Sequence, residues 1–174
     1  VFGASLALLT AEEQAAFAAI EHPARRHEYL AGHGLLHHAI GEFIKSADYE
    51  MHFWNGKIQF GFAGQEYFAS LTHNDEHFAV AIADVPVGAD LTTDEDPVFL
   101  EAVADKWAAP EERAFLESFS PEQRHYYFNR GFGLRESFLK ASVLDSEAVR
   151  TQIVFKHLPP GEVAQMYRRD RFGI

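Results

Sequence analysis

The chain contains no cysteine among its 174 residues. Without cysteine it forms no disulfide, offers no thiolate to zinc and has no cysteine nucleophile. Basic residues are also scarce, because 15 Lys and Arg stand against 26 Asp and Glu, for a formal net charge of −11. Nucleic-acid-binding proteins displace counterions with clustered Lys and Arg. We therefore expect no nucleic-acid partner.

Long hydrophobic runs are absent as well. The apolar stretch at residues 1–9 lacks a basic start, and it falls well below the roughly 20 residues that a membrane helix needs. The sequence therefore predicts no membrane partner and a cytoplasmic protein. It leaves open whether a segment precedes Val1.

The composition is that of a folded globule. Apolar residues make up 47% of the chain, and 16 of the residues are Phe. This content predicts a core rich in large rings, in one ordinary domain or in two small halves that share a core. Mixed helical and strand patterns predict an α+β fold with an N-terminal half at 1–86 and a C-terminal half at 87–174.

Capping signals and apolar periodicity define the elements. Thr10 followed by Glu12 and Glu13 is typical of a helix start, and so is Ser120 followed by Pro121. An Asn-Gly pair at 55–56 indicates a turn. Helices are predicted at 10–20, 24–45, 98–106, 110–118 and 121–141, and strands at 67–71, 78–83, 87–91, 152–158 and 162–167.

Three charged residues suggest phosphate chemistry. Asp90 at a strand end and Glu136 on a distant helix can bind one hard cation through oxygen. Glu136 and Lys140 are four apart and share a helix face. Two carboxylates and a lysine around one point would suit a magnesium-bound pyrophosphate. Each alone equally fits an ordinary role, namely a loop-capping acid at Asp90 and a solvated ion pair between Glu136 and Lys140.

Five segments, taken together, resemble the motifs of one family. YLAGHGLLH at 29–37 resembles an Ala-Gly-Arg-x-Leu-x-Arg helix, Gly56 and Lys57 match a Gly-Lys-Pro element, and FASLTHN at 68–74 resembles an Asn-Leu-Ser-His-Ser strand end. VGADL at 87–91 resembles a Gly-Ile/Val-Asp-Ile-Glu strand, and FGLRESFLKA at 132–141 resembles a Trp-x-x-Lys-Glu-Ser-x-x-Lys-Ala helix. In this order they resemble the surfactin-type 4'-phosphopantetheinyl transferases.

The resemblance implies a fold and an activity. The fold would be two similar α+β halves with a cleft between them, and the protein would be a monomer. The activity would be that of a holo-[acyl-carrier-protein] synthase. Such an enzyme uses magnesium to move the 4'-phosphopantetheine arm of coenzyme A to a serine of an acyl or peptidyl carrier protein, and it releases 3',5'-ADP.

The same resemblance implies roles for particular residues. Asp90 and Glu136 would hold magnesium, Glu136 would receive the serine proton, and Lys140 would bind the pyrophosphate, so these three form the predicted catalytic set. His73 would touch the 3'-phosphate region. The predicted coenzyme A contacts are Arg25, Arg26, His33, Lys57, Thr72, His73 and Lys140.

Several positions depart from the family pattern. Thr92 stands where many members carry a third acid, and Arg135 replaces the motif lysine. His33 and His37 replace two arginines, and neutral imidazole binds phosphate less well than guanidinium. Their four-residue spacing also leaves a metal site open. Two alternatives therefore remain: a degenerate relative that binds coenzyme A or a carrier protein without catalysis, and an unrelated acidic α+β binding module.

Overall fold

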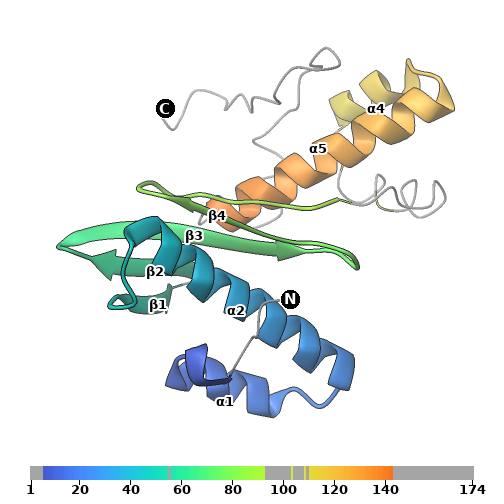
Figure 1. The fold of residues 1–174 in the computed structure, drawn as a ribbon. Coiled ribbons are helices and arrows are strands. Elements are labelled where there is room, and N and C mark those ends of the chain that lie inside the picture. The colour runs from blue at the N-terminus through green and yellow to red at the C-terminus, as the bar shows by residue number, and fades with distance from the viewer. Residues whose placement is uncertain (1–5, 55, 93–102, 104–107, 109, 143–174) are drawn as a thin grey trace. The chain divides into compact units, whose positions relative to one another are not determined.

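The computed structural model describes residues 6–54, 56–92, 103, 108 and 110–142. The chain divides into two compact units, Val1–Leu91 and Thr92–Ile174. Figure 1 shows the helices and strands of each unit along the chain. The predicted boundary at residue 86, the similarity of two halves and the cleft stay predictions.

Unit 1 pairs helices with an antiparallel sheet. A short 3₁₀ helix, η1, precedes two α-helices, and four strands follow in the order β1-β2-β3-β4, each antiparallel to its neighbour. Helix α2 lies along one face of this sheet (Figure 1). The elements are η1 (Leu6–Leu8), α1 (Ala11–Ala19), α2 (Pro23–Ile44), β1 (Glu50–Trp54), β2 (Lys57–Phe62), β3 (Gln65–His73) and β4 (Phe78–Ala83).

Local capping sets where both helices of unit 1 begin and end. Thr10 Oγ1 accepts from the Glu13 N–H at 3.2 Å, and Glu13 Oε2 accepts from the Thr10 N–H at 2.8 Å. This reciprocal capping box satisfies two amides at the helix start. Helix α2 begins at Pro23, which suits the first helical position, and ends at Lys45 in a left-handed conformation (φ 55°). The helices predicted at 10–20 and 24–45 are confirmed.

The core of unit 1 lies between α2 and the sheet. Leu36 and Ile40 of α2 pack on Phe60 of β2 and Ala69 of β3, and all four are buried. Gly32 marks the closest approach, since a Cβ there would lie 3.1 Å from Leu71 Cδ2. Phe60 and Ala69 thus lie on the face of the sheet that packs on α2.

Unit 2 contains a helical hairpin among its described residues. Helix α4 spans Pro110–Glu117 and α5 spans Pro121–Ala141, as predicted. Ser120 and Gln123 form a capping box at the start of α5. Near the turn, Arg124 Nε donates to the Leu116 carbonyl at 3.2 Å, and the Phe119 ring lies 4.7 Å from that of Tyr127. These contacts close the hairpin at its turn.

The strand predicted at 87–91 is wrong. Among the described residues this segment belongs to no strand, and the N–H groups of Ala89 and Leu91 donate to hydroxyls of β3. The prediction also missed β1, β2 and the tight turn between β2 and β3, where Ala63 (φ 52°) and Gly64 (φ 79°) are left-handed. The strands predicted at 152–158 and 162–167, and nearly all of the helix at 98–106, lie outside the described residues.

The predicted α+β fold class is confirmed, because helices accompany an antiparallel four-stranded sheet. Within the described part of the chain, no helix is long and apolar enough to cross a membrane.

Candidate functional site

Asp90 is held in place by two hydroxyls of β3. Thr72 is only 4% exposed, and its Oγ1 accepts from the Leu91 N–H at 3.1 Å and lies 3.4 Å from Asp90 Oδ1, to which it donates. Ser70 Oγ accepts from the Ala89 N–H at 3.1 Å. Because a hydroxyl can donate and accept at once, Thr72 fixes both the backbone and the carboxylate of this segment. Thr72 was predicted to contact coenzyme A; its position here is beside Asp90.

Lys57 shares a sheet face with Thr72. Successive side chains of a strand point to opposite faces. Ile58 and Ala69 pair across β2 and β3 and pack toward α2. Their neighbours therefore point away from α2, which puts Lys57, Thr72 and the segment of Asp90 on the same face. Burial lowers the pKa of Lys57.

His73 is the next residue along β3 and points to the face opposite Thr72. It is exposed, and its ring stacks on that of Phe78, with centroids 5.2 Å apart. Thr72 and His73, both predicted to bind coenzyme A, thus lie on opposite faces of the sheet.

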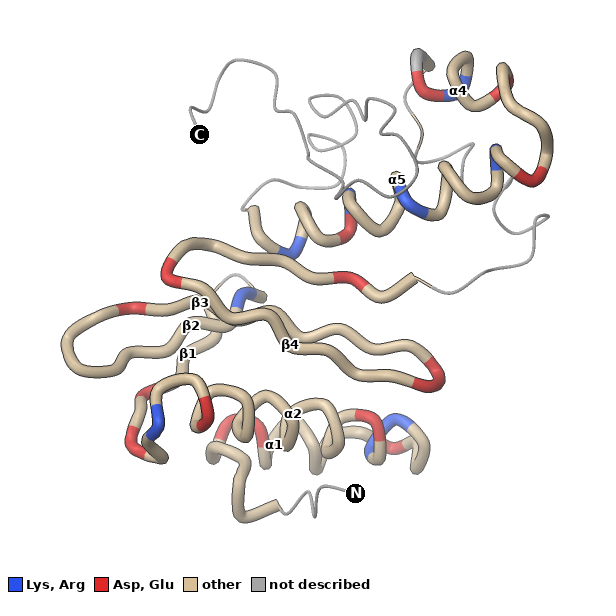
Figure 2. The backbone as a smooth tube through the Cα atoms, turned by 45° about the horizontal axis from the view of Figure 1, so that its top comes forward, with Lys and Arg blue, Asp and Glu red and all other residues tan. Residues whose placement is uncertain are grey.

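The predicted contacts on α2 lie on the other side of the sheet. Arg25 is exposed and has Glu28 at 3.8 Å, and Arg26 stacks over the Phe17 ring at 4.5 Å. Figure 2 shows basic positions, in blue, at the start of α2. The ring of His33 stacks on Tyr29, 4.0 Å away. The structure therefore brings Lys57, Thr72 and Asp90 to one face and keeps the α2 residues together on the other.

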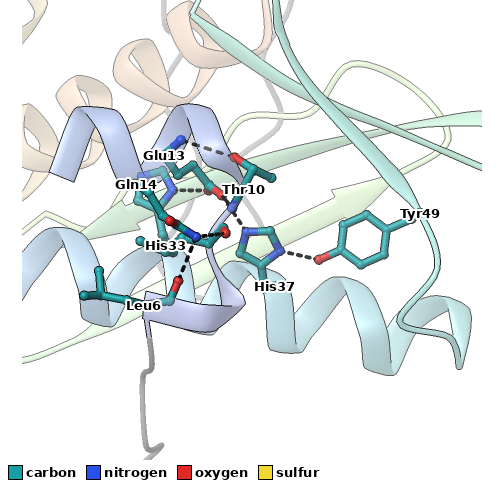
Figure 3. Close-up of polar contacts among 8 residues, drawn as sticks. Leu6, Thr10, Glu13, Gln14, His33, His37 and Tyr49 are labelled. Atoms are coloured by element: carbon teal, nitrogen blue, oxygen red, sulfur yellow. Dashed lines mark hydrogen bonds and ion pairs between the residues drawn. The ribbon is translucent and has the colours of Figure 1, made fainter. Parts of the chain in front are cut away.

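A buried carboxylate joins the two histidines of α2 to α1. Glu13 is 1% exposed. Its Oε1 accepts from His33 Nδ1 at 2.6 Å, and its Oε2 accepts from His37 Nε2 at 2.7 Å (Figure 3). An ionised carboxylate only accepts, so both rings must donate to it. Both donating nitrogens are thus engaged by Glu13.

Electrostatics keep Glu13 ionised. Burial alone would raise the pKa of Glu13, but hydrogen bonds from His33, His37 and the Thr10 N–H, together with charge attraction to His37, hold it well below its usual 4.5. Tyr49 contacts the other nitrogen of His37, Nδ1. Burial, helped by the charge of Glu13, raises the pKa of Tyr49 to about 12. The phenol of Tyr49 therefore stays protonated beside His37 Nδ1.

Helix α5 carries the predicted acid and lysine of unit 2. Glu136 and Lys140 are one turn apart and partly buried. Arg135, the residue before Glu136, is 3% exposed and forms an ion pair with Glu112 of α4, which is 6% exposed. Arg135 thus points into the hairpin of unit 2.

Sequence reasoning missed three residues of these networks. Glu13 was interpreted only as an acid of a first helical turn, and Tyr49 and Glu112 were not singled out. The spacing of Thr10 and Glu13 does signal a capping box. Nothing local indicates the partners of Tyr49 and Glu112, which tertiary packing brings in.

The chemistry of Asp90 and Glu136 suits magnesium, since both offer the carboxylate oxygens that this cation prefers. The two residues belong to different units. In the described ranges, no group of three or more His, Asp or Glu is placed to hold a metal ion. A magnesium site shared by these two acids stays a prediction.

Comparison with known families gives one match. A model described as the 4'-phosphopantetheinyl transferase superfamily matches residues 86–163, somewhat less than half of the chain. This part of the chain is therefore similar to a phosphopantetheinyl transferase domain, and the α+β architecture is consistent with that fold family. A search of curated proteins found no match.

Proposed function

We propose that this chain transfers the 4'-phosphopantetheine arm of coenzyme A to a serine of an acyl or peptidyl carrier protein. The family match carries the proposal, because residues 86–163 include Asp90, Glu136 and Lys140. The anchoring of Asp90 by Thr72 supports it, since a fixed carboxylate is suited to hold a metal. The more specific assignment, a surfactin-type holo-[acyl-carrier-protein] synthase, rests on the five motif segments.

The reaction exchanges one phosphorus–oxygen bond for another. The serine oxygen bonds to the phosphorus that carries the pantetheine arm, and the bond from that phosphorus to the 3',5'-ADP oxygen breaks. The bonding electrons leave with 3',5'-ADP. The serine proton passes to Glu136, directly or through water.

Side chains of this protein hold the reacting groups in place. Asp90 and Glu136 would hold magnesium, which when bound supplies positive charge to the pyrophosphate oxygens. Lys140 adds a fixed ammonium charge for the leaving group. The remaining coenzyme A contacts proposed from the resemblance are Arg25, Arg26, His33, Lys57, Thr72 and His73.

One structural observation favours a second function. His33 and His37 occupy the positions of family arginines, and both direct a ring nitrogen at the buried Glu13. A phosphate would have to compete with that carboxylate. A degenerate transferase-fold protein that binds coenzyme A or a carrier protein without catalysis is therefore the alternative.

Measuring the mass of apo carrier proteins before and after incubation distinguishes transfer from binding without catalysis. After incubation with this protein, coenzyme A and magnesium, we expect a carrier to gain one phosphopantetheine arm. Asp90→Ala and Glu136→Ala should each slow the gain at least about 100-fold, because each removes a charged group acting on the reacting phosphate. Glu122→Ala, which removes an exposed acid at the start of α5, should leave the rate unchanged.

Two outcomes would contradict the proposal. Full turnover in either Asp90→Ala or Glu136→Ala would refute the site. No gain in any carrier, with coenzyme A still bound, would support the non-catalytic alternative.

A further inference from the structure

The buried ion pair between Arg135 and Glu112 stands beside the proposed site without belonging to it. Arg135 Nη2 donates to Glu112 Oε2, and the two residues are 3% and 6% exposed. They lie 23 positions apart, on different helices of unit 2. The guanidinium is thus engaged inside the hairpin rather than presented as an open phosphate ligand.

The ion pair gives the hairpin a second fixed point. The first lies at the turn, where Arg124 bonds to the Leu116 carbonyl and Phe119 packs on Tyr127. Arg135 lies about three helical turns beyond Arg124 along α5. Glu112 lies in the first turn of α4. The two points together set the direction of α4 and the rotation of α5 about its own axis.

We propose that Glu112 and Arg135 are positioning residues for the transfer reaction, which place the Glu136 carboxylate and Lys140 by locking α5 onto α4. This inference rests on the proposed function. Consecutive helical side chains diverge by about 100°, since 3.6 residues make a turn. Arg135 therefore faces α4 while Glu136 projects to the side, and a rotation of α5 that releases Arg135 displaces Glu136 with it.

The chemistry of the ion pair explains why it can fix the position of Glu136 and Lys140 as well as stabilise the hairpin. A guanidinium is a rigid planar fork whose bonds to a carboxylate are directional. Apolar contacts are non-directional. Replacing both members of a buried ion pair by apolar residues often preserves stability, whereas removing one member leaves a buried charge unpaired. Stability and positioning can therefore be separated by mutation.

The test uses steady-state kinetics with a carrier that the wild-type protein modifies. The double variant Glu112→Leu/Arg135→Met leaves no unpaired charge and should stay folded by circular dichroism and thermal unfolding. We expect its kcat to fall at least about 10-fold, since a misplacement of about 1 Å can cost about 100-fold. Any rise in the KM for coenzyme A should be smaller than the fall in kcat. Arg135→Lys, which keeps the charge, should recover part of kcat.

Glu117→Leu is the matched control, because it removes an exposed acid from the same helix and should leave both constants unchanged. A raised KM with unchanged kcat would overturn the positioning role and make Arg135 a phosphate ligand. An unchanged kcat in the folded double variant would show that the pair is only structural. A third result is distinct from these two: if the wild-type protein modifies no carrier, both the proposed function and this inference are overturned.

Discussion

At the scale of single residues, Glu13 makes hydrogen bonds that join several elements of unit 1. Its carboxylate is buried, and its two oxygens accept from His33, His37 and the Thr10 N–H. A buried charge is costly unless it is paired and hydrogen-bonded. One acid at the third position of α1 therefore fixes α1 on α2, and through His37 it reaches Tyr49 before β1.

Replacing Glu13 should cost stability and alter its pH dependence. At pH 7 we expect Glu13→Gln to lower the free energy of unfolding by about 3 kcal/mol, because a buried charged partner of two imidazoles is lost. The depressed folded-state pKa stabilises fully above the ordinary value of 4.5, and that contribution is lost as the pH falls from there toward the folded value. Urea unfolding between pH 7 and pH 3 measures both effects, and the variant should lose less stability across the acid range.

Glu12→Gln is the control for this prediction, since Glu12 is the exposed neighbour in the same helical turn. It should change the free energy of unfolding by no more than about 0.5 kcal/mol. Equal acid profiles for wild type and Glu13→Gln would show that Glu13 is not ionised by its contacts.

At the scale of elements, the packing of α2 on the sheet depends on a glycine. A Cβ at Gly32 would lie 3.1 Å from Leu71 Cδ2 and 3.5 Å from the Phe78 ring. The absence of a side chain lets the helix approach β3 and β4 at this turn. Further along, Leu36 and Ile40 fill the space with larger side chains.

A branched side chain at Gly32 should overpack this contact. We expect Gly32→Val to lower the free energy of unfolding by about 1–3 kcal/mol, because inserted methyl groups force neighbouring side chains to move. Gly41→Val is a useful comparison, since a Cβ there would meet just the Ser46 carbonyl, at 3.4 Å. Chemical denaturation of both variants measures the difference, and a larger loss at Gly41 would contradict the packing described for Gly32.

At the scale of the whole molecule, the net charge of −11 opposes the binding of an anionic substrate. For the proposed function, the basic groups of the site and a magnesium ion would have to overcome this field locally. Binding to the folded state then appears as added stability.

Coenzyme A with magnesium should raise the Tm. A hundredfold excess over Kd adds about 2.7 kcal/mol, which corresponds to about 5–10 °C for a protein of this size. EDTA should abolish most of the shift, because the proposed contacts include the metal. Scanning fluorimetry measures it, with Asp90→Ala as the variant in which the metal-dependent part is lost. A shift that is the same with EDTA would contradict a role for magnesium.

The sequence predicted the helices well because their limits are local. Thr10 with Glu13, and Ser120 with Gln123, cap amides within three residues, so α1 and α5 begin where the capping signals indicate. The same locality placed Glu136 and Lys140 one turn apart. Their metal and substrate roles rest on the motif resemblance and stay predictions.

The sequence by itself determined the α+β class, the limits of four helices and the strong acidity of the chain, because each depends on neighbouring residues or on composition. Tertiary structure alone decided which groups meet: Glu13 with His33 and His37, Arg135 with Glu112, and β3 hydroxyls with the segment of Asp90. These partners lie 18 to 24 positions apart. Such pairs form because packing buries the charged or polar groups together. No local sequence pattern specifies which residues become partners.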